Sequence, residues 1–331
     1  MKTKILFIER KFWEFVSIEK VFRQIAATLS KEKFEYSFCQ MPFGNSFKEV
    51  FKNILFFRKS EAKIYHITGH IHYISLVLPR NRTVLTIHDL RFLHNRKGLR
   101  RFVLKKLFLD LPVKKLKYIT AISQTTKAEI LKFTGCDENK IHLIDNPIRE
   151  FKNTENQIFN TTCPTILQIG TMTNKNLPNL INALKGIDCK LRVIGRLDEK
   201  LSKKLKESEI EYSNAFDLDD DEMEEEYRNA DIIAFCSTYE GFGLPIIEGQ
   251  MMRTPVITSN LSPMKEVSGG AAFLADPFNV ESIRAGILKI LRESDYRESL
   301  IEKGIENVKR FDQHKIAEQY ENLYAEILSN N

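Results

Sequence analysis

Cysteine is scarce in this chain and is never paired at close spacing. The 331 residues include five cysteines, an odd number. They stand at Cys39, Cys136, Cys163, Cys189 and Cys236. Because no Cys-x2-Cys pair occurs, a cysteine metal site is not expected. Reduced thiols in a cytoplasmic setting are expected instead.

Long apolar runs are also missing. No stretch approaches the ~18 apolar residues that a membrane-spanning helix needs. The chain begins with a basic and then apolar segment, 1–8, which Glu9, Arg10 and Lys11 interrupt. A segment this short predicts a first β-strand rather than a signal peptide. The sequence has no low-complexity tract and no internal repeat beyond two similar halves.

Charge is distributed unevenly along the chain. The net charge is +6, and 43% of the residues are hydrophobic, as in a soluble globular protein. Residues 1–150 carry a net charge of roughly +15, and the remainder carries roughly −9. A basic half suits an anionic partner, either a membrane surface or a nucleic acid. No aromatic-plus-basic recognition motif supports the nucleic acid, so none is expected as a partner.

Strand and helix patterns alternate along both halves. Repeated strand–helix units predict parallel, doubly wound sheets with helices on both faces. The polar segment 149–162 is the best candidate for a linker. We therefore expect an α/β protein with two Rossmann-like domains that face a cleft. The expected strands cover 5–8, 36–39, 64–67, 83–87, 118–122, 141–144, 165–169, 191–194, 210–212, 232–235, 255–258 and 271–274.

The most informative segment is 237–248, which follows an apolar strand. Gly241 and Gly243 allow a tight turn, and Pro245 suits the first turn of a helix. Such a turn directs backbone N–H groups and the positive end of a helix dipole at one point, which suits a phosphate. Glu240 and Glu248 bracket the turn and could accept hydrogen bonds from sugar hydroxyls. The alternative is an ordinary turn of a parallel sheet with two solvated glutamates.

The Glu-x7-Glu spacing around this turn resembles the retaining glycosyltransferases of family 4, which have the GT-B fold. Other segments support the resemblance along nearly the whole chain. It implies that Glu240 holds hydroxyls of the donor sugar and that Glu248 binds the ribose. The implied donor-binding residues are Gly170, Lys175, Glu240, Gly241, Phe242, Gly243, Leu244 and Glu248. In the family, backbone groups near 214–218 contact the base, so uridine and guanosine remain equal possibilities.

Gly170 and Lys175 follow the first strand of the second half. A compact cation at this place could neutralise charge on a departing diphosphate, as the family lysine does. The alternative is a surface lysine in a strand–helix connection. The family often has an arginine a few residues earlier, whereas residues 171–174 include none. Arg196, after the next strand, is a candidate substitute.

A histidine follows the expected strand 83–87 of the first half. His88 precedes Asp89 and matches a family histidine that contacts the donor sugar or the reacting centre. The resemblance thus implies His88, Lys175 and Glu240 as the catalytic residues. The alternative for His88 is a structural histidine capped by its neighbour. His66, His70 and His72 lie close in sequence but lack carboxylates or cysteines at useful spacing, so no metal is expected.

The segment 96–117 is basic and amphipathic. Lys97, Arg101 and Lys105 recur every four residues, and Leu104, Leu107, Phe108 and Leu111 form an apolar stripe. We expect the stripe to pack on the sheet. The basic excess predicts a dock on an anionic membrane surface, since each such residue contributes about 1 kcal/mol there.

The loop after the first strand, 9–17, departs from the family. It contains no glycine, although the family usually has glycines there that let the backbone approach the donor and acceptor. Phe12 and Trp13 either stack on a sugar face or belong to the core.

The domains expected are a Rossmann-like acceptor domain over 1–150 and a Rossmann-like nucleotide-sugar domain over 163–312. A C-terminal helix over 313–331 is expected to cross back to the first domain. The cysteine usage and the basic segment predict a cytoplasmic enzyme, peripheral on the inner face of the membrane. The resemblance implies its reaction. The enzyme would move a hexose from UDP- or GDP-hexose, without a cofactor, to a glycan or lipid-linked glycan of a surface polysaccharide or lipopolysaccharide.

Two kinds of alternative stand beside this function. One is a sugar-nucleotide epimerase or a phosphorylase of the same fold. A phosphorylase would normally bring a pyridoxal lysine and a longer chain. The other is a non-catalytic relative that binds glycans or nucleic acid.

Overall fold

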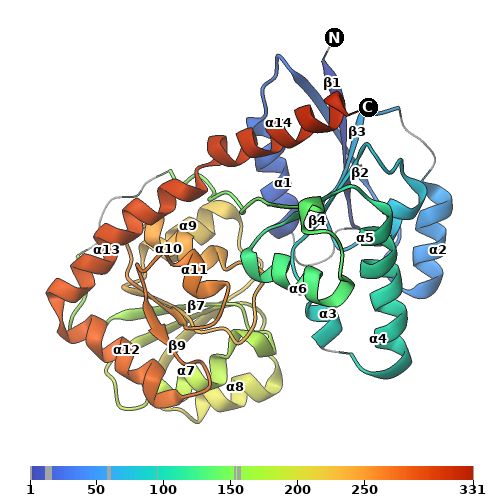
Figure 1. Ribbon diagram of the computed structural model, residues 1–331. Helices are drawn as coiled ribbons and strands as arrows, with labels where there is room; N and C mark the ends of the chain where they lie inside the picture. Colours follow the sequence, from blue (N-terminus) through green and yellow to red (C-terminus); the bar gives the residue numbers. More distant parts are fainter. Residues whose placement is uncertain are drawn as a thin grey trace. The chain divides into compact units, whose positions relative to one another are not determined.

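The computed structural model describes residues 2–11, 17–57, 61–94, 96–152, 154 and 158–330. The chain divides into two compact units (Figure 1). Unit 1 combines Met1–Pro147 with Phe311–Asn331, and unit 2 is Ile148–Arg310. Phe12 and Trp13 lie outside the described residues.

A six-stranded sheet forms the centre of unit 1, and its neighbouring strands all pair in parallel. The strand order is β2-β1-β3-β4-β5-β6. The central strands are buried along their length, because a parallel sheet has both faces covered. The strands are β1 (Thr3–Glu9), β2 (Phe34–Gln40), β3 (Ile64–Ile67), β4 (Thr83–Ile87), β5 (Tyr118–Ala121) and β6 (Ile141–Leu143).

Local sequence signals set the ends of several helices in unit 1. The side chain of Ser123 accepts a hydrogen bond from the Thr126 N–H and so caps α6, which stops at the left-handed Gly135 (φ 63°). The helices are α1 (Ser17–Thr28), α2 (Phe47–Phe56), α3 (Arg91–His94), α4 (Gly98–Lys105), α5 (Leu111–Lys115), α6 (Gln124–Thr134) and α14 (Gln313–Ser329). Short helical turns are η1 (His72–Val77), η2 (Lys106–Asp110) and η3 (Glu138–Lys140).

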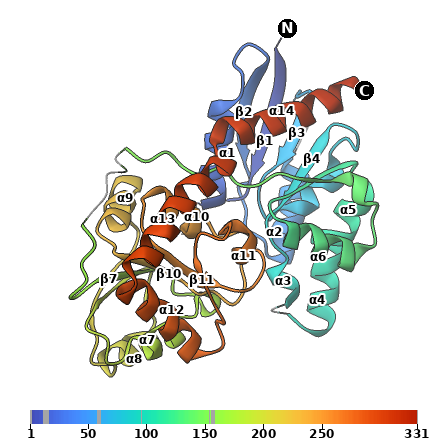
Figure 2. The same cartoon turned by 60° about the vertical axis from the view of Figure 1, so that its left-hand side comes forward.

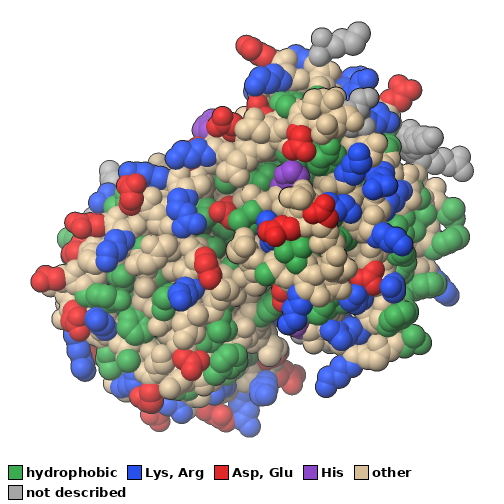
Figure 3. All heavy atoms as spheres, viewed as in Figure 1, with side chains coloured by type: hydrophobic (Ala, Val, Ile, Leu, Met, Phe, Trp, Pro, Cys, Tyr) green, Lys and Arg blue, Asp and Glu red, His purple; other side chains and the backbone are tan. Residues whose placement is uncertain are grey.

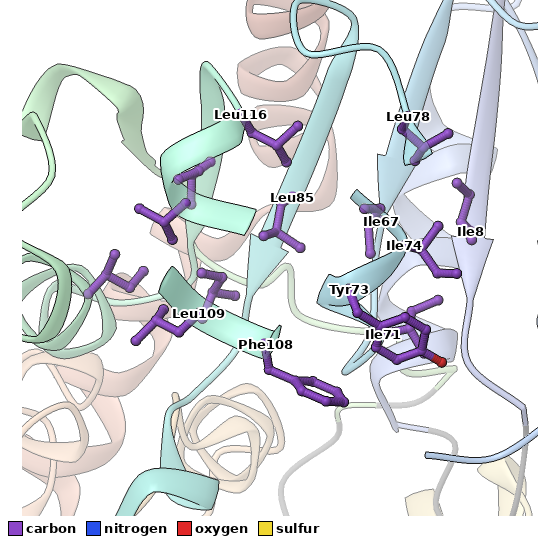
Figure 4. Close-up of a cluster of buried hydrophobic side chains, with 14 of the residues drawn as sticks. Ile8, Ile67, Ile71, Tyr73, Ile74, Leu78, Leu85, Phe108, Leu109 and Leu116 are labelled. Atoms are coloured by element: carbon purple, nitrogen blue, oxygen red, sulfur yellow. The ribbon is translucent and has the colours of Figure 1, made fainter. Parts of the chain in front are cut away.

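One hydrophobic cluster joins several helical segments of unit 1, among them α2, α6 and η2, to one face of its sheet (Figure 4). Tyr73 of η1 and Phe108 of η2 meet edge to face, with ring centroids 5.2 Å apart. Both rings are buried. In the view of Figure 4, Phe108 lies between Leu109 and Tyr73, and Ile71 and Ile74 are drawn next to Tyr73. Aromatic pairs of this kind stabilise a core by about 1 kcal/mol beyond the area they bury.

The C-terminal helix α14 packs on unit 1 beside α1 (Figures 1 and 2). Tyr324 of α14 shares a 2.7 Å hydrogen bond with Nδ1 of His66, and Nε2 of His66 lies 2.8 Å from Oγ1 of Thr86. Burial lowers the pKa of His66 to about 3. The end of the chain is therefore fixed to the sheet by a buried, neutral hydrogen-bond network.

Unit 2 repeats the parallel architecture with a second six-stranded sheet. Its strand order is β12-β11-β10-β7-β8-β9. β7 and β10 are neighbours, so the loops that follow these two strands leave adjacent positions on the carboxyl edge. The strands are β7 (Thr165–Ile169), β8 (Lys190–Ile194), β9 (Glu211–Ala215), β10 (Ile232–Phe235), β11 (Val256–Ser259) and β12 (Phe273–Ala275).

The helices of unit 2 follow its strands in regular alternation. Asp219 caps α9 with a capping box that Glu222 completes. The helices are α7 (Leu177–Leu184), α8 (Glu199–Lys206), α9 (Asp220–Arg228), α10 (Leu244–Met251), α11 (Met264–Val267), α12 (Val280–Arg292) and α13 (Ser294–Val308), with the helical turns η4 (Thr173–Lys175) and η5 (Lys309–Phe311), the latter extending to unit 1.

The sequence predicted every one of these strands within a few residues, and the α/β prediction is confirmed. One difference is local. Within the basic segment 96–117 the backbone stays helical from α4 to α5, but the π-helical turn η2 interrupts the regular α-helical pattern between them. Leu104 and Leu107 pack on the core as expected, but Leu111 remains 41% exposed. Among the described residues, no helix is long and apolar enough to cross a membrane.

Candidate functional site

The turn between β10 and α10 has the geometry that its glycines predicted. Gly243 has a φ of 116°, a conformation that side-chain-bearing residues rarely adopt. A Cβ atom at this position would lie 3.0 Å from the Ile246 side chain. Gly243 therefore allows α10 to start directly after the turn, with Pro245 in its first turn. Phe242 is buried beneath the turn, and Leu244 is the first residue of the helix.

Lys175 lies against this turn, although it comes from the loop after β7. Its Nζ is 2.7 Å from Oε1 of Glu240, and both side chains are 14% exposed. The ammonium group also lies 4.6 Å from the ring centre of Phe235. Gly170 makes room for the lysine, because a Cβ there would lie 2.9 Å from its Cγ and Cε. The structure thus brings Gly170, Lys175 and Glu240 together.

Asn174 connects the two turns and was not among the expected site residues. Its Nδ2 donates to the carbonyl of Tyr239 (2.9 Å) and to Oε1 of Glu240 (3.1 Å). Its backbone carbonyl accepts from the Thr238 N–H at 2.8 Å. Its Oδ1 is buried and has no hydrogen-bond partner among the described residues. Asn174 therefore holds the Glu240 turn in place. In the sequence, the one indication of this role is its position directly before Lys175.

Glu248 belongs to a separate cluster further along α10. Its Oε2 accepts a 2.5 Å hydrogen bond from the hydroxyl of Tyr227 in α9, and its Oε1 lies 3.3 Å from Nε of Arg149. Burial, and then the charge of Glu248, raise the pKa of Tyr227 well above its ordinary value. Tyr227 therefore stays protonated and donates. Neither Tyr227 nor Arg149 was expected at this site, because no sequence motif connects them to Glu248.

His88 belongs to unit 1, whereas Lys175 and Glu240 belong to unit 2. Its side chain is buried, and Nε2 donates to the carbonyl of Thr68 at 2.8 Å. Burial, followed by the nearby His70, lowers the pKa of His88 to about 3. The imidazole is therefore neutral at physiological pH, with its proton on Nε2. It can contact a ligand only as an uncharged group.

Arg196 does not present a free cation in this structure. Its guanidinium pairs with Asp217 and lies 4.8 Å from the ring centre of Phe216. Its backbone carbonyl accepts a hydrogen bond from the Thr171 hydroxyl at 2.6 Å. Its charge is thus paired within unit 2, as that of Lys175 is by Glu240.

Among the described residues, several acidic side chains and histidines make ion pairs, helix caps or hydrogen bonds within the protein. Asp217 and Asp219 form an Asp-x-Asp sequence, but Asp217 pairs with Arg196 and Asp219 caps α9. His72 donates from Nδ1 to the carbonyl of Phe108. Within the described residues, no group of three or more His, Cys, Asp or Glu side chains could hold a metal ion.

Two family models match the chain and together span most of it. The model of glycosyl transferases group 1 matches residues 150–307, and the model of glycosyltransferase family 4 matches residues 24–150. The chain therefore belongs to the group 1 glycosyltransferases of family 4. Its two parallel sheets with flanking helices form the GT-B fold.

Two curated relatives match parts of the chain that differ in length. The O-antigen chain mannosyltransferase B of Escherichia coli is 36% identical over 105 residues, which cover 32% of this chain and 28% of that protein. The O-antigen chain mannosyltransferase RfbU of Salmonella typhimurium is 27% identical and covers 65% of this chain. The matched region spans 62% of the length of RfbU, so each match falls short of two thirds of the relative.

A solved structure resembles the whole chain. Anabaena HepE, crystallised with UDP and glucose, aligns with a TM-score of 0.77 over 99% of this chain and 100% of its own. The sequence identity is 15%, so the likeness concerns the fold.

Proposed function

We propose that this protein is a retaining hexosyltransferase that uses a nucleotide diphosphate sugar and acts in the synthesis of a surface polysaccharide or lipopolysaccharide. The observation that carries the proposal is the 2.7 Å pair of Lys175 and Glu240 beside the start of α10. Family membership and the O-antigen relatives support the same reaction class.

The chemistry follows from the groups at this site. Backbone N–H groups of Gly241, Gly243 and Leu244 would face the donor phosphates at the positive end of α10. Lys175 would exchange its contact with Glu240 for the diphosphate, and Glu240 would then accept hydrogen bonds from hydroxyls of the hexose. Glu248 would accept from the ribose. The donor is UDP-hexose or GDP-hexose, and the bases are not distinguished by any side chain here.

In the proposed reaction the bond between the anomeric carbon and the diphosphate oxygen breaks. The acceptor hydroxyl oxygen bonds to that carbon from the same face, so the configuration is retained. The leaving nucleoside diphosphate takes the acceptor proton. Lys175 stabilises the charge that develops on the leaving group. His88 would contact the donor sugar as a neutral hydrogen-bonding group, because its lowered pKa argues against a cationic or basic role.

A direct test is to combine binding and turnover. UDP-hexoses and GDP-hexoses are screened for thermal stabilisation, and the best binder is assayed for transfer and for the configuration of the product. A glycosyltransferase releases the nucleoside diphosphate. An epimerase instead returns a nucleotide sugar in which the configuration of the sugar has changed. Binding of a glycan without release of any nucleotide would favour the non-catalytic alternative.

We further propose that unit 1 docks on an anionic membrane, where a lipid-linked acceptor is available. An exposed apolar surface on α2 and α4 supports this partner. We call it the α2–α4 surface. It consists of Phe47, Phe51, Leu55, Phe56, Leu99 and Phe102, each between 54% and 77% exposed. Figure 3 shows hydrophobic side chains at the right-hand edge of the molecule, over the region of α2 and α4, among lysines and arginines.

The two helices of this surface rest on the same core. Ile54 of α2 and Leu104 of α4 both pack against the hydrophobic cluster of unit 1. Exposed cations accompany the apolar side chains, with Lys48 and Lys52 on α2 and Arg100 on α4. Apolar side chains flanked by cations suit the boundary between lipid headgroups and acyl chains. A lipid surface explains both features, whereas a dimer contact would place these like charges against one another.

Vesicle binding separates the apolar and the charged contributions. The variant Phe47→Ser/Phe51→Ser/Leu55→Ser should lose binding to mixed phosphatidylglycerol and phosphatidylcholine vesicles. Phe278→Ser, which changes an exposed phenylalanine of unit 2, is the matched control. Arg100→Glu/Arg101→Glu should lose the preference for anionic lipid. Unchanged vesicle binding by both sets of variants, or a dimer that the first set dissociates, would overturn the membrane proposal.

A further inference from the structure

Arg149 approaches the proposed ribose-binding carboxylate from the beginning of unit 2. Its Nε lies 3.3 Å from Oε1 of Glu248. Its Nη1 donates to the backbone carbonyl of Asp220 at 3.1 Å. The guanidinium carbon lies 4.3 Å from the ring centre of Phe151 and 5.7 Å from that of Tyr227. The cation is therefore held between an aromatic ring, the start of α9 and the carboxylate of α10.

Part of the guanidinium is buried with its hydrogen-bonding capacity unused. Nε and Nη2 are inaccessible to solvent, and neither makes a hydrogen bond of good geometry among the described residues. Unsatisfied donors destabilise a folded protein, and for a charged group the effect is large. For a residue that only tied the linker down, an apolar side chain stacked on Phe151 would avoid this cost. The arrangement is more easily understood if the charge acts on Glu248.

Glu248 is held from two sides. Tyr227 donates to Oε2 at 2.5 Å, and Arg149 faces Oε1. Tyr227 is fully buried, so its hydroxyl cannot follow the carboxylate to another position. A carboxylate fixed in this way keeps one orientation. That is the condition for charge-assisted hydrogen bonds to a pair of sugar hydroxyls.

We propose that Arg149 is a positioning residue, which fixes Glu248 as the acceptor for the ribose hydroxyls and thereby makes the site prefer ribonucleotides to 2′-deoxyribonucleotides. This inference depends on the proposed role of Glu248 in ribose binding. Arg149 acts through Glu248 and does not itself contact the nucleotide, since its free N–H groups are inaccessible.

A neighbouring residue provides a matched comparison. Lys152 also attaches segment 148–152 to α9, through Asp221 at 2.5 Å and through its backbone N–H to Glu224 at 2.9 Å. None of these contacts involves Glu248. Loss of the Lys152 side chain would loosen the same segment without changing the charge beside the carboxylate. A comparison of variants at Arg149 and Lys152 therefore distinguishes attachment of the segment from orientation of Glu248.

The test measures dissociation constants by calorimetry for UDP, GDP and their 2′-deoxy counterparts. The wild type should prefer the ribonucleotide by about tenfold, the scale of one hydrogen bond to a charged group. Arg149→Met keeps an unbranched stem against Phe151 but removes the charge, and it should bring the preference close to one. Arg149→Lys should restore part of it. Lys152→Met should leave it unchanged.

The outcomes distinguish this inference from the function on which it depends. If Glu248→Gln abolishes the preference while Arg149→Met retains it, the role of Arg149 is wrong and that of Glu248 stands. If Glu248→Gln retains the preference, the ribose assignment fails. An equal loss of affinity for both nucleotides in Arg149→Met would identify a purely structural residue. Tyr227→Phe, which removes the other support of Glu248, serves if Arg149→Met does not fold.

Discussion

Polar side chains near the carboxyl edges of the two sheets differ in burial and in charge. In unit 1, His66, His72 and His88 are buried and make hydrogen bonds to hydroxyl and carbonyl groups. In unit 2, Lys175 and Glu240 keep a part of their surface accessible and balance each other's charge. All seven histidines of the chain lie outside unit 2.

The glycines at the two edges also differ. In unit 2, Gly170 and Gly243 have positive φ angles and leave space for the lysine and for the start of α10. In unit 1, the sequence after β4 has no glycine before Gly98, and His88 turns into the core. The edge of unit 1 also carries charged pairs, Arg10 with Glu19 and Arg23 with Glu9, but their carboxylates are almost fully buried. The two edges therefore differ in their histidines and in how accessible their carboxylates are.

The largest effect should come from the charged pair. Lys175→Ala should lower kcat/KM for the sugar nucleotide by about 10²–10³-fold, because a partly buried cation beside the proposed leaving group is lost. Lys203→Ala changes an exposed lysine of α8 in the same unit and should leave turnover unchanged. Steady-state kinetics with the best donor measures both. A larger loss in His88→Asn than in Lys175→Ala would reverse the assignment of the main electrostatic role to unit 2.

Acid should destabilise unit 1 before unit 2. The folded-state pKa values of His66 and His88 are lowered to about 3, and that of His72 to about 4, mainly by burial. The unfolded chain binds protons at these residues below about pH 6.5, whereas the folded chain does not. Stability is therefore complete above pH 6.5 and falls as the pH decreases towards 4. For each of these histidines, the free energy of unfolding falls by up to about 1.4 kcal/mol per pH unit in this range.

Hydrogen exchange at pH 7 and pH 5 measures this difference region by region. Amides of β3, β4 and α14 should lose protection, while those of β7 and β10 keep most of theirs. Earlier loss of protection in unit 2 would show that the buried histidines do not control the response to acid.

The attachment of the C-terminal helix should depend on one hydroxyl. Tyr324→Phe leaves Nδ1 of His66 buried without its partner and should lower the free energy of unfolding by about 1–3 kcal/mol. Tyr118→Phe is the control, since its hydroxyl accepts only a 3.2 Å hydrogen bond from Asn330 at the end of the chain. Urea unfolding compares the two variants. Equal destabilisation by both would argue against the His66 network as the main attachment.

The smallest effect should come from a glycine pair in unit 2. Gly170 and Gly186 both have positive φ angles, so alanine at either position should cost about 1 kcal/mol of backbone strain. Only at Gly170 would the new Cβ displace Lys175, because nothing lies within 4 Å of it at Gly186. Gly170→Ala should therefore also lower turnover severalfold. Equal turnover in the two variants would show that the space left by Gly170 is not needed for the function of Lys175.

Much of the fold was predictable from local patterns. Apolar runs such as 165–169 and 232–235, bounded by turn residues, predict strands wherever they fall in the chain. The pairing of Lys175 with Glu240 was also within reach, because β7 and β10 would have to be neighbours for both to serve one ligand. The π-helical turn at 106–110 was not, since 96–117 has a regular amphipathic pattern.

The supports of the site could not be predicted in the same way. Arg149 stands 99 residues before Glu248, in a polar segment that resembles any linker. Tyr227 lies in an acidic helix whose sequence indicates a solvated face. The exposure of Phe47 and Phe51 was equally hidden, because an amphipathic helix does not reveal which of its apolar residues the core will cover.

The sequence alone determined the order of strands and helices and the chemical groups at the ends of the strands, because both depend on residues close together in the chain. Only the tertiary structure decided which charges meet, which histidines lose water and which phenylalanines remain outside. Those outcomes depend on contacts between distant residues, and local spacing carries no information about them.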